Sequence, residues 1–346
     1  MSVNVYFASE FSANSIRALF ERAYRDMPEK LSDGDRVAMK VHFGEKGNTR
    51  FVSPQYIRPI IAELKKYTSD YFLTDSNTLY RGSRLTTSDH IKQAHEHGFG
   101  ALDTRIIIAD GETGSEEITI PINKHIFSNV KIAKQIAISD ALVVISHFKG
   151  HLLFGFGGAI KNIGMGGGSR AGKLEMHSKI KPSVGKGCTG CGNCVEHCPA
   201  DAITMNGDKA VIDEELCIGC AQCISVCDYD AIQVPWHGAR GREVRQRCAE
   251  YAYGALLGKK KIFITFINNI TKDCDCLADT RLIGKDVGIV ASIDPVACDR
   301  AAFDLVYQNH GNKDIFKEVT NVDGTQILDY AEEIGLGTQS YGLIGI

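Results

Sequence analysis

Eight of the twelve cysteines in this chain of 346 residues fall into two copies of one spaced pattern. Each copy reads Cys-x2-Cys-x2-Cys-x3-Cys, and the copies begin at Cys188 and Cys217. In this spacing three thiolates of a tight loop bind one [4Fe–4S] cluster, while the fourth cysteine reaches the other cluster. The pattern therefore predicts two [4Fe–4S] clusters and a role in electron transfer.

The crossed ligand pattern assigns each cysteine to a cluster. One cluster is expected to bind Cys188, Cys191, Cys194 and Cys227, and the other Cys217, Cys220, Cys223 and Cys198. Asp228 stands where the first copy has Pro199, and its carboxylate would affect the potential of the first cluster. The repeat resembles that of bacterial two-cluster ferredoxins. Two zinc sites, or clusters that only stabilise the fold, are the alternatives.

A glycine-rich segment, residues 147–173, follows a predicted strand at 141–146. Glycines let the backbone approach an anion closely, and ligands of α/β sheets bind beyond the carboxyl ends of strands. We therefore expect a pocket here that binds a small anionic substrate. Its candidate catalytic residues are His147, His151, Lys161 and His177, and its candidate cofactor-binding residues are Gly155, Gly157 and Gly158. The alternative is a crowded turn in which the histidines only cap and pack.

Cys274 and Cys276 are a further pair of sulfur donors. Their spacing suits a soft metal better than an intramolecular disulfide, so they are a candidate third metal site in the α/β domain. Two ordinary buried thiols are the alternative. The segments 41–44 and 294–299 also carry polar groups near predicted strand ends, and all these groups could meet along one rim of the sheet.

Alternating apolar runs and helical periods predict an α/β domain with a largely parallel sheet. Strands are expected at 3–8, 36–43, 71–74, 105–109, 141–146, 261–267 and 287–292. The clearest helices are expected at 53–67, where Ser53 can cap, and at 242–257 and 295–307. The α/β pattern stops near Pro182 and resumes after Pro235. We therefore expect an α/β domain over 1–181 and 237–346, interrupted by an inserted α+β ferredoxin-like domain over 182–236.

The composition narrows the classes of function. Lys plus Arg total 39 and Asp plus Glu 42, which gives a formal net charge of −3 and disfavours nucleic acid as a partner. No segment has the length and apolar character of a membrane span, and residues 1–11 lack the pattern of a signal peptide. These features predict a cytoplasmic protein.

Three segments together resemble the family known as domain of unknown function 362. They are residues 147–166, the Cys274–Asp275–Cys276 triplet and residues 294–299. In that family a ferredoxin module often interrupts or follows the main domain. The resemblance implies this architecture but no reaction.

The segment around Lys161 is also similar to the active site of lactate racemases. In that family a lysine holds a nickel-pincer nucleotide covalently, a later histidine ligates nickel, and an earlier histidine exchanges protons with the substrate. The similarity would give these roles to Lys161, His177 and His151. Racemisation needs no net electrons, so two clusters would be idle in such an enzyme.

We interpret the chain as an anaerobe-type redox protein whose two clusters exchange electrons with a site in the α/β domain and with an electron donor or acceptor protein. Its enzymatic role would be that of an oxidoreductase. A non-catalytic electron carrier or docking module is the main alternative, and a lactate-racemase-like enzyme is the second.

Overall fold

The computed structural model describes residues 2–236, 238–239, 241–278 and 281–346, and its centre is a mixed sheet with the order β16-β1-β15-β14-β7-β2-β3-β4. All neighbouring strands are parallel except β15, which runs antiparallel to β1 and β14. The predicted α/β fold with a largely parallel sheet is confirmed. The strands are β1 Val3–Ala8, β2 Val37–Lys40, β3 Tyr71–Asp75, β4 Arg105–Ile108, β7 Ala141–His147, β14 Lys260–Ile267, β15 Gly288–Ser292 and β16 Tyr341–Gly345.

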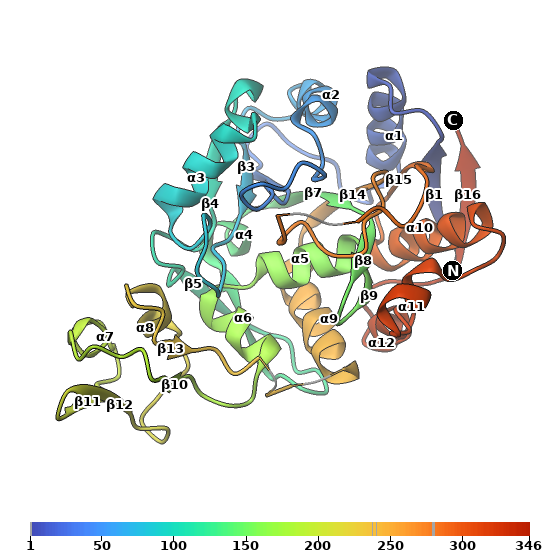
Figure 1. Cartoon of the computed structure of the whole chain (residues 1–346). Coiled ribbons are helices and arrows are strands. Elements are labelled where there is room, and N and C mark those ends of the chain that lie inside the picture. Colours follow the sequence, from blue (N-terminus) through green and yellow to red (C-terminus); the bar gives the residue numbers. More distant parts are fainter. Residues whose placement is uncertain (1, 237, 240, 279–280) are drawn as a thin grey trace.

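Helices cover both faces of this sheet (Figure 1). One hydrophobic core lies beneath α1 (Ala13–Asp26) and α2 (Pro54–Leu64), and the other beneath α5 (Ala159–Gly167), α9 (Arg242–Leu256) and α10 (Pro295–Asn309). Ser53 stands at the N-cap of α2 as predicted, but its side chain makes no capping hydrogen bond. Pro54 at the first helical position, whose nitrogen carries no hydrogen, starts this helix instead.

Shorter elements surround these layers. They are α3 Thr87–Glu96, the 3-10 helix η1 Phe99–Leu102, the hairpin of β5 Glu117–Pro121 and β6 Asn129–Ala133, α4 Lys134–Ala137, the hairpin of β8 Lys149–His151 and β9 Gly155–Gly157, α6 Arg170–His177, α11 Ile315–Thr320 and α12 Gln326–Glu333. The β8–β9 hairpin directly follows β7 and carries the glycine-rich segment to the start of α5.

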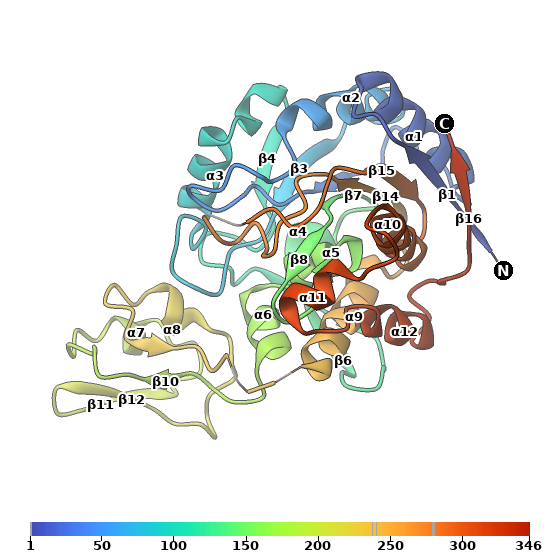
Figure 2. The same ribbon diagram turned by 45° about the vertical axis from the view of Figure 1, so that its right-hand side comes forward.

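The segment between α6 and α9, which we call the cysteine module (residues 182–236), contributes no strand to the large sheet. Its elements are β10 Ser183–Val184, α7 Asn193–Glu196, β11 Ile203–Asn206, β12 Lys209–Ile212, α8 Gln222–Ser225 and β13 Ile232–Gln233. Strands β10 and β13 pair with each other where the chain enters and leaves the module. Both views place the module to one side of the sheet (Figures 1 and 2). The exact domain boundaries at 182 and 236 stay a prediction.

The module has its own small hydrophobic core, formed by Cys194, Cys223, Cys227 and neighbouring apolar residues. Two side chains from outside the module, Leu79 and Leu174, are part of the same buried cluster. The module therefore packs directly against the loop after β3 and against α6. Among the described residues, no helix is both long and apolar enough to cross a membrane.

Candidate functional site

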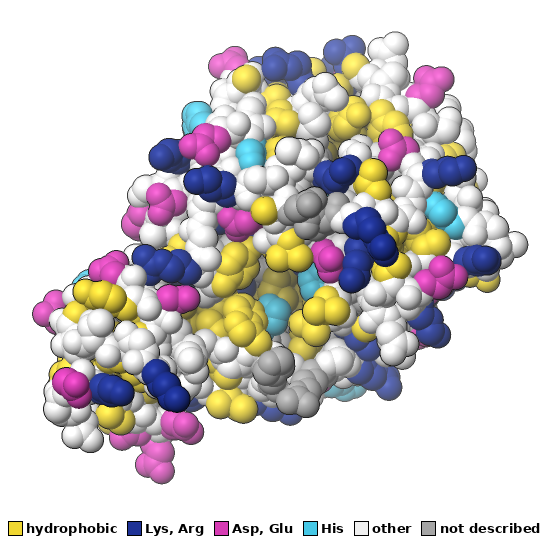
Figure 3. Space-filling view, in the orientation of Figure 1, with side chains coloured by type: hydrophobic (Ala, Val, Ile, Leu, Met, Phe, Trp, Pro, Cys, Tyr) yellow, Lys and Arg dark blue, Asp and Glu magenta, His cyan; other side chains and the backbone are white. Residues whose placement is uncertain are grey.

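A cavity of about 300 Å³ lies at the carboxyl edge of the parallel strands β2, β3 and β7. The edge supplies Lys40, Asp75 and His147, while α5, α6 and the loop after β14 close the sides. Figure 3 shows this face hollowed beside the module, with hydrophobic side chains around the hollow and histidine inside it. Such a position beyond the carboxyl ends of parallel strands is where α/β proteins place ligands.

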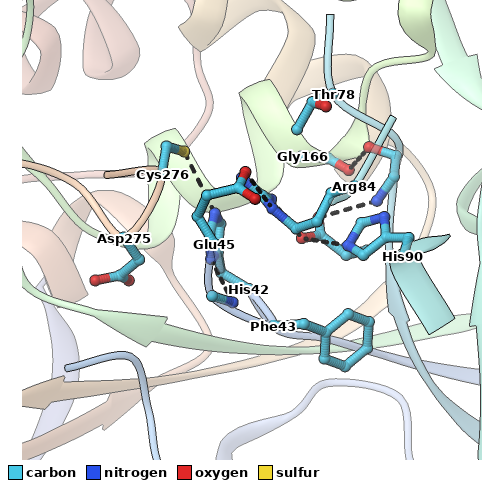
Figure 4. Close-up of polar contacts among 12 residues, drawn as sticks. His42, Phe43, Glu45, Thr78, Arg84, His90, Gly166, Asp275 and Cys276 are labelled. Carbon is cyan, nitrogen blue, oxygen red and sulfur yellow. Dashed lines mark hydrogen bonds and ion pairs between the residues drawn. The ribbon is translucent and has the colours of Figure 1, made fainter. Parts of the chain in front are cut away.

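A buried ion pair forms the floor of the cavity. Lys40 Nζ lies 2.9 Å from Asp75 Oδ1 and donates to Asn162 Oδ1 at 2.8 Å. His90 and Arg84 approach the other carboxylate oxygen of Asp75, at 3.7 and 3.6 Å. Burial alone would raise the pKa of Asp75, but its charged neighbours, with Lys40 first, hold it well below its usual value. Asp75 is therefore a fixed negative charge between Lys40 and Arg84. Figure 4 shows the Arg84 and His90 side chains that approach it.

Arg84 connects this floor to a second carboxylate. Its Nε lies 3.2 Å from Glu45 Oε2, and its Nη2 donates to the Tyr80 hydroxyl at 2.7 Å. Ser83 Oγ donates to Glu45 Oε1 at 2.5 Å. We call residues 78–84 the β3 loop. These contacts with Glu45 fix the loop at the wall of the cavity.

His147 ends β7 and is buried with both ring nitrogens engaged. Nδ1 lies 2.9 Å from Asp275 Oδ1, and Nε2 lies 2.8 Å from the carbonyl oxygen of Asn268. Lys149 Nζ is 3.3 Å from Asp275 Oδ2. Burial alone would raise the pKa of Asp275, but His147 and Lys149 hold it well below its usual value. His147 thus anchors the loop after β14, which leaves its ring without a free nitrogen for substrate.

The two sulfurs predicted as a metal site line the same cavity as Lys161. Cys276 Sγ lies 3.4 Å from His42 Nε2, and the His42 ring is oriented by the Gly44 N–H, which donates to its Nδ1 at 3.0 Å. A hydrogen bond from the Cys274 thiol lowers the pKa of Cys276 well below its usual value. Burial would lower the pKa of Lys161, but the two sulfurs raise it above its usual value, so this amine is a cation at neutral pH.

His151 and His177 both line the cavity as neutral rings. His151 Nδ1 accepts the Leu153 N–H at 3.1 Å, which leaves Nε2 for other partners. Burial lowers the pKa of His177 to about 4, and it lowers that of His151 well below the usual value. His177 Nδ1 is buried without a hydrogen-bond partner among the described residues. These rings could bind a metal or exchange a proton.

The three glycines predicted to bind a cofactor do not all lie at the cavity. Gly158 lines the cavity, whereas Gly155 and Gly157 do not. Gly155 has a φ of +77°, and a side chain there would meet the backbone of Gly324. A side chain on Gly157 would lie 3.0 Å from the Lys161 stem. These two glycines therefore shape the hairpin beneath Lys161.

Asp299 fixes the start of the helix that carries Lys161. Its carboxylate accepts the Ala159 N–H at 2.6 Å and the Ile160 N–H at 2.9 Å. Asp294, as predicted, caps α10 by accepting the N–H groups of Val296 and Ala297. Both aspartates of segment 294–299 thus orient helices, and neither lines the cavity.

The eight module cysteines surround two further small cavities. One is lined by Cys188, Cys191, Cys194 and Cys227, and the other by Cys198, Cys217, Cys220 and Cys223. The grouping crosses between the two copies of the motif. Backbone N–H groups point at three of the sulfurs: Ala210 at Cys188, Ala202 at Cys198 and Ala231 at Cys227. Four thiols around one space, with N–H donors to sulfur, suit a [4Fe–4S] cluster.

Several cavity residues were not singled out from the sequence, namely Lys40, Asp75, Tyr80 and Arg84. A signal for the first two was present, because a lysine and an aspartate stand inside or at the end of otherwise apolar strands. Tyr80 and Arg84 lie in a loop whose position depends on tertiary packing. Among the described residues, no group of three or more His, Cys, Asp or Glu side chains is arranged to hold a single metal ion.

The family model described as "Domain of unknown function (DUF362)" matches residues 37–304. A curated protein named "Probable ferredoxin" from Methanosarcina thermophila is 61% identical over 28 residues, which is 8% of this chain and 48% of that protein. This match supports an iron–sulfur character for the short stretch that it covers.

Two solved structures are similar in part. The lactate racemase apoprotein from Thermoanaerobacterium thermosaccharolyticum is 15% identical with a TM-score of 0.39, covering 76% of this chain and 50% of that one. A Thermotoga maritima protein is 12% identical with a TM-score of 0.41, covering 86% and 59%. The chain thus spans little more than half the length of these structures.

Proposed function

The chain belongs to the DUF362 family, whose description assigns no reaction, and we propose from its own residues that it is an iron–sulfur redox protein. Two [4Fe–4S] clusters in the cysteine module exchange electrons with a site in the cavity of the α/β domain. The clusters supply one-electron chemistry when bound, and the cavity residues bind and orient the substrate.

One observation carries this proposal: the β3 loop touches both the cavity and the module. Leu79, Tyr80 and Arg84 line the cavity. Leu79 is also buried in the core of the module, and Arg81 Nη1 donates to the carbonyl oxygen of Cys227 at 2.6 Å. One short loop therefore both contacts a proposed cluster ligand, through Arg81, and lines the cavity, through Leu79, Tyr80 and Arg84.

The charges of the cavity favour a small anionic substrate. Lys40 and Lys149 are paired with Asp75 and Asp275, whereas Lys161 has no carboxylate within ion-pair distance among the described residues. Its Nζ lies 5.7 Å from the centre of the Phe154 ring. A carboxylate that enters the cavity would gain a charge-assisted hydrogen bond from Lys161, which is partly buried.

Metal analysis tests the cluster part of the proposal. Protein purified without oxygen should contain about eight irons and eight sulfides per chain. Cys198→Ala should mainly damage the cluster of Cys217, Cys220 and Cys223, as seen by EPR of the reduced protein. Stoichiometric zinc in place of iron, or selective loss of the cluster of Cys188, would contradict the assignment.

A reoxidation experiment tests the cavity part. The clusters are reduced by light and deazaflavin, excess reductant is removed, and the return of visible absorbance is followed after addition of single small carboxylic and oxo acids. We expect at least one acid to speed reoxidation, and Lys161→Ala to abolish the effect with both clusters intact. Lys65→Ala, at an exposed lysine, is the control. If no acid acts, the chain is better described as an electron carrier.

A metal cofactor on Lys161 is the second candidate function. Two observations favour it. His151, Lys161 and His177 line one cavity, and the Nδ1 atom of His177 has no hydrogen-bond partner among the described residues. The amine could hold an organic group, and the two rings are neutral and could serve as a metal ligand and a proton carrier. Nickel that co-purifies with the wild type, together with a mass increase on the peptide of Lys161, would support this function over the first.

A further inference from the structure

We propose that Cys274 and Cys276 form a redox-active dithiol that receives electrons from the cluster ligated by Cys227. This inference rests on the proposed function and deepens it, because it names the first electron acceptor inside the cavity. The acceptor is a disulfide between two side chains of this chain.

The local backbone brings the two sulfurs within reach of each other. An extended chain would separate residues two apart by roughly 7 Å, at the upper limit for a disulfide. Here Leu277 N–H donates to the Cys274 carbonyl oxygen at 3.1 Å, which closes a turn over residues 274–277 and shortens that separation. Both cysteines also line the same cavity, so the turn presents the two side chains to one space.

The residue between the cysteines holds the turn in place. The Asp275 carboxylate is buried against His147 and Lys149, and Figure 4 shows it on a different side of the loop from the Cys276 sulfur. Glu45 N–H also donates to the Asp275 carbonyl oxygen at 3.0 Å. The anchor leaves both thiols half-buried at the cavity, whereas Cys248 and Cys298 are fully buried in the core.

A short path of contacts connects the dithiol to the module. Arg81 donates to the Cys227 carbonyl oxygen, and its neighbour Tyr80 lines the cavity together with Cys276. Arg84 fixes that hydroxyl by a hydrogen bond of 2.7 Å. The β3 loop thus reaches from a predicted cluster ligand to the cavity that contains the sulfur, and Tyr80 and Arg81 act as positioning residues along this path.

The proposed step balances in electrons and protons. Two reduced clusters each give one electron to the Cys274–Cys276 disulfide, its S–S bond breaks, and two protons from solvent complete the two thiols. The clusters end oxidised. His42, at 3.4 Å from Cys276 Sγ, is placed to pass a proton to that sulfur. Reduction of one disulfide needs two electrons, and two [4Fe–4S] clusters supply one electron each. This equality of electron number is the chemical reason to connect the clusters with the dithiol.

The first experiment tests whether the disulfide forms. Holoprotein is treated without oxygen with a small organic disulfide, free thiols are alkylated, and the trypsin digest is analysed by mass. We expect peptide 273–281, which contains only these two cysteines, to lose two hydrogens and escape alkylation. Peptides 248–259 and 286–300, with the core thiols Cys248 and Cys298, should stay reduced in the same digest. Free thiols in 273–281, or a metal that is bound there and lost in Cys276→Ser, would overturn the inference.

The second experiment tests where the electrons come from. The oxidised protein is titrated with photoreduced deazaflavin, and reduction of the clusters is followed by absorbance. The wild type should take about four electrons, two for the clusters and two for the disulfide, whereas Cys276→Ser should take about two. Uptake of two electrons by the wild type, with the disulfide intact, would overturn the electron path from the clusters. Absence of iron from the purified protein would overturn the proposed function itself. The peptide experiment would still show, independently of iron, whether the disulfide forms.

Discussion

At the scale of single residues, the cavity floor depends on charges that are almost completely removed from water. Lys40 and Asp75 are 1% and 3% exposed, so each charge is tolerated only because it is paired. A buried pair adds little stability compared with a well-packed apolar pair, but removal of one partner is costly because it leaves an uncompensated buried charge. The pair therefore matters more for the arrangement of the cavity than for net stability.

We predict that Asp75→Asn lowers the free energy of unfolding by about 3–5 kcal/mol, because Lys40 and Arg84 lose their common counter-charge. Denaturation by urea would measure this loss. The matched control is Glu116→Gln, which breaks the exposed pair with Lys134 and should cost under about 1 kcal/mol. Equal losses in both variants would contradict this account of the floor.

The Lys40–Asp75 pair also makes the free energy of unfolding depend on pH. The pKa of Asp75 is lower in the folded state than in the unfolded state, so its stabilising contribution is present above about pH 4 and is lost as the pH falls further. The loss of stability between about pH 5 and 3 should therefore be smaller in Asp75→Asn than in the wild type, as measured by urea denaturation at each pH.

The sequence located candidate residues well where spacing defines them and less well where tertiary packing does. The cysteine repeat and the glycine-rich segment carry their chemistry in local order, and residues from both line cavities. His147 was predicted as catalytic, but its two nitrogens are occupied by Asp275 and Asn268. Its partner Asp275 is 128 residues away in the chain, so no local pattern could indicate this pairing.

At the scale of elements, the central strands and long helices agree with the sequence prediction to within a few residues, because buried strands and amphipathic helices have clear periods. The hairpin of β5 and β6 and the final strand β16 were not predicted. Both have mixed burial and lie at the margin of the fold, where tertiary contacts decide the structure.

Asp299 links two elements, and this link is testable. We predict that Asp299→Ala lowers the free energy of unfolding by about 1–3 kcal/mol, because the N–H groups of Ala159 and Ile160 lose their acceptor inside the protein. Gln308→Ala, at an exposed position of the same helix α10, is the control, and it should be close to neutral. An Asp299→Ala protein as stable as the wild type would show that α5 holds its position without this cap.

At the scale of the whole molecule, the large sheet is built without any strand of the cysteine module. We predict that replacement of residues 182–236 by a short Gly-Ser linker leaves a folded α/β domain with the circular dichroism of a mixed α/β protein. Because Leu79 and Leu174 lose their cover, this variant should bind a hydrophobic dye such as ANS more strongly than the wild type. Leu79→Ser in the shortened chain should reduce the dye signal. Loss of cooperative unfolding would instead show that the module is part of the fold.

The pairing of β1 sets an order of events during synthesis. Its two partners are β15 and β16, although β1 lies at residues 3–8 and its partners lie beyond residue 287. At roughly 5–20 residues per second, the ribosome needs on the order of tens of seconds between the first strand and its first partner. During that interval the strands β2, β3, β4 and β7 can already pair with one another. The backbone N–H and C=O groups of β1 still lack their partners in β15 and β16. During synthesis, β1 is therefore a strand whose unpaired backbone is exposed to wrong association until β15 and β16 have been made.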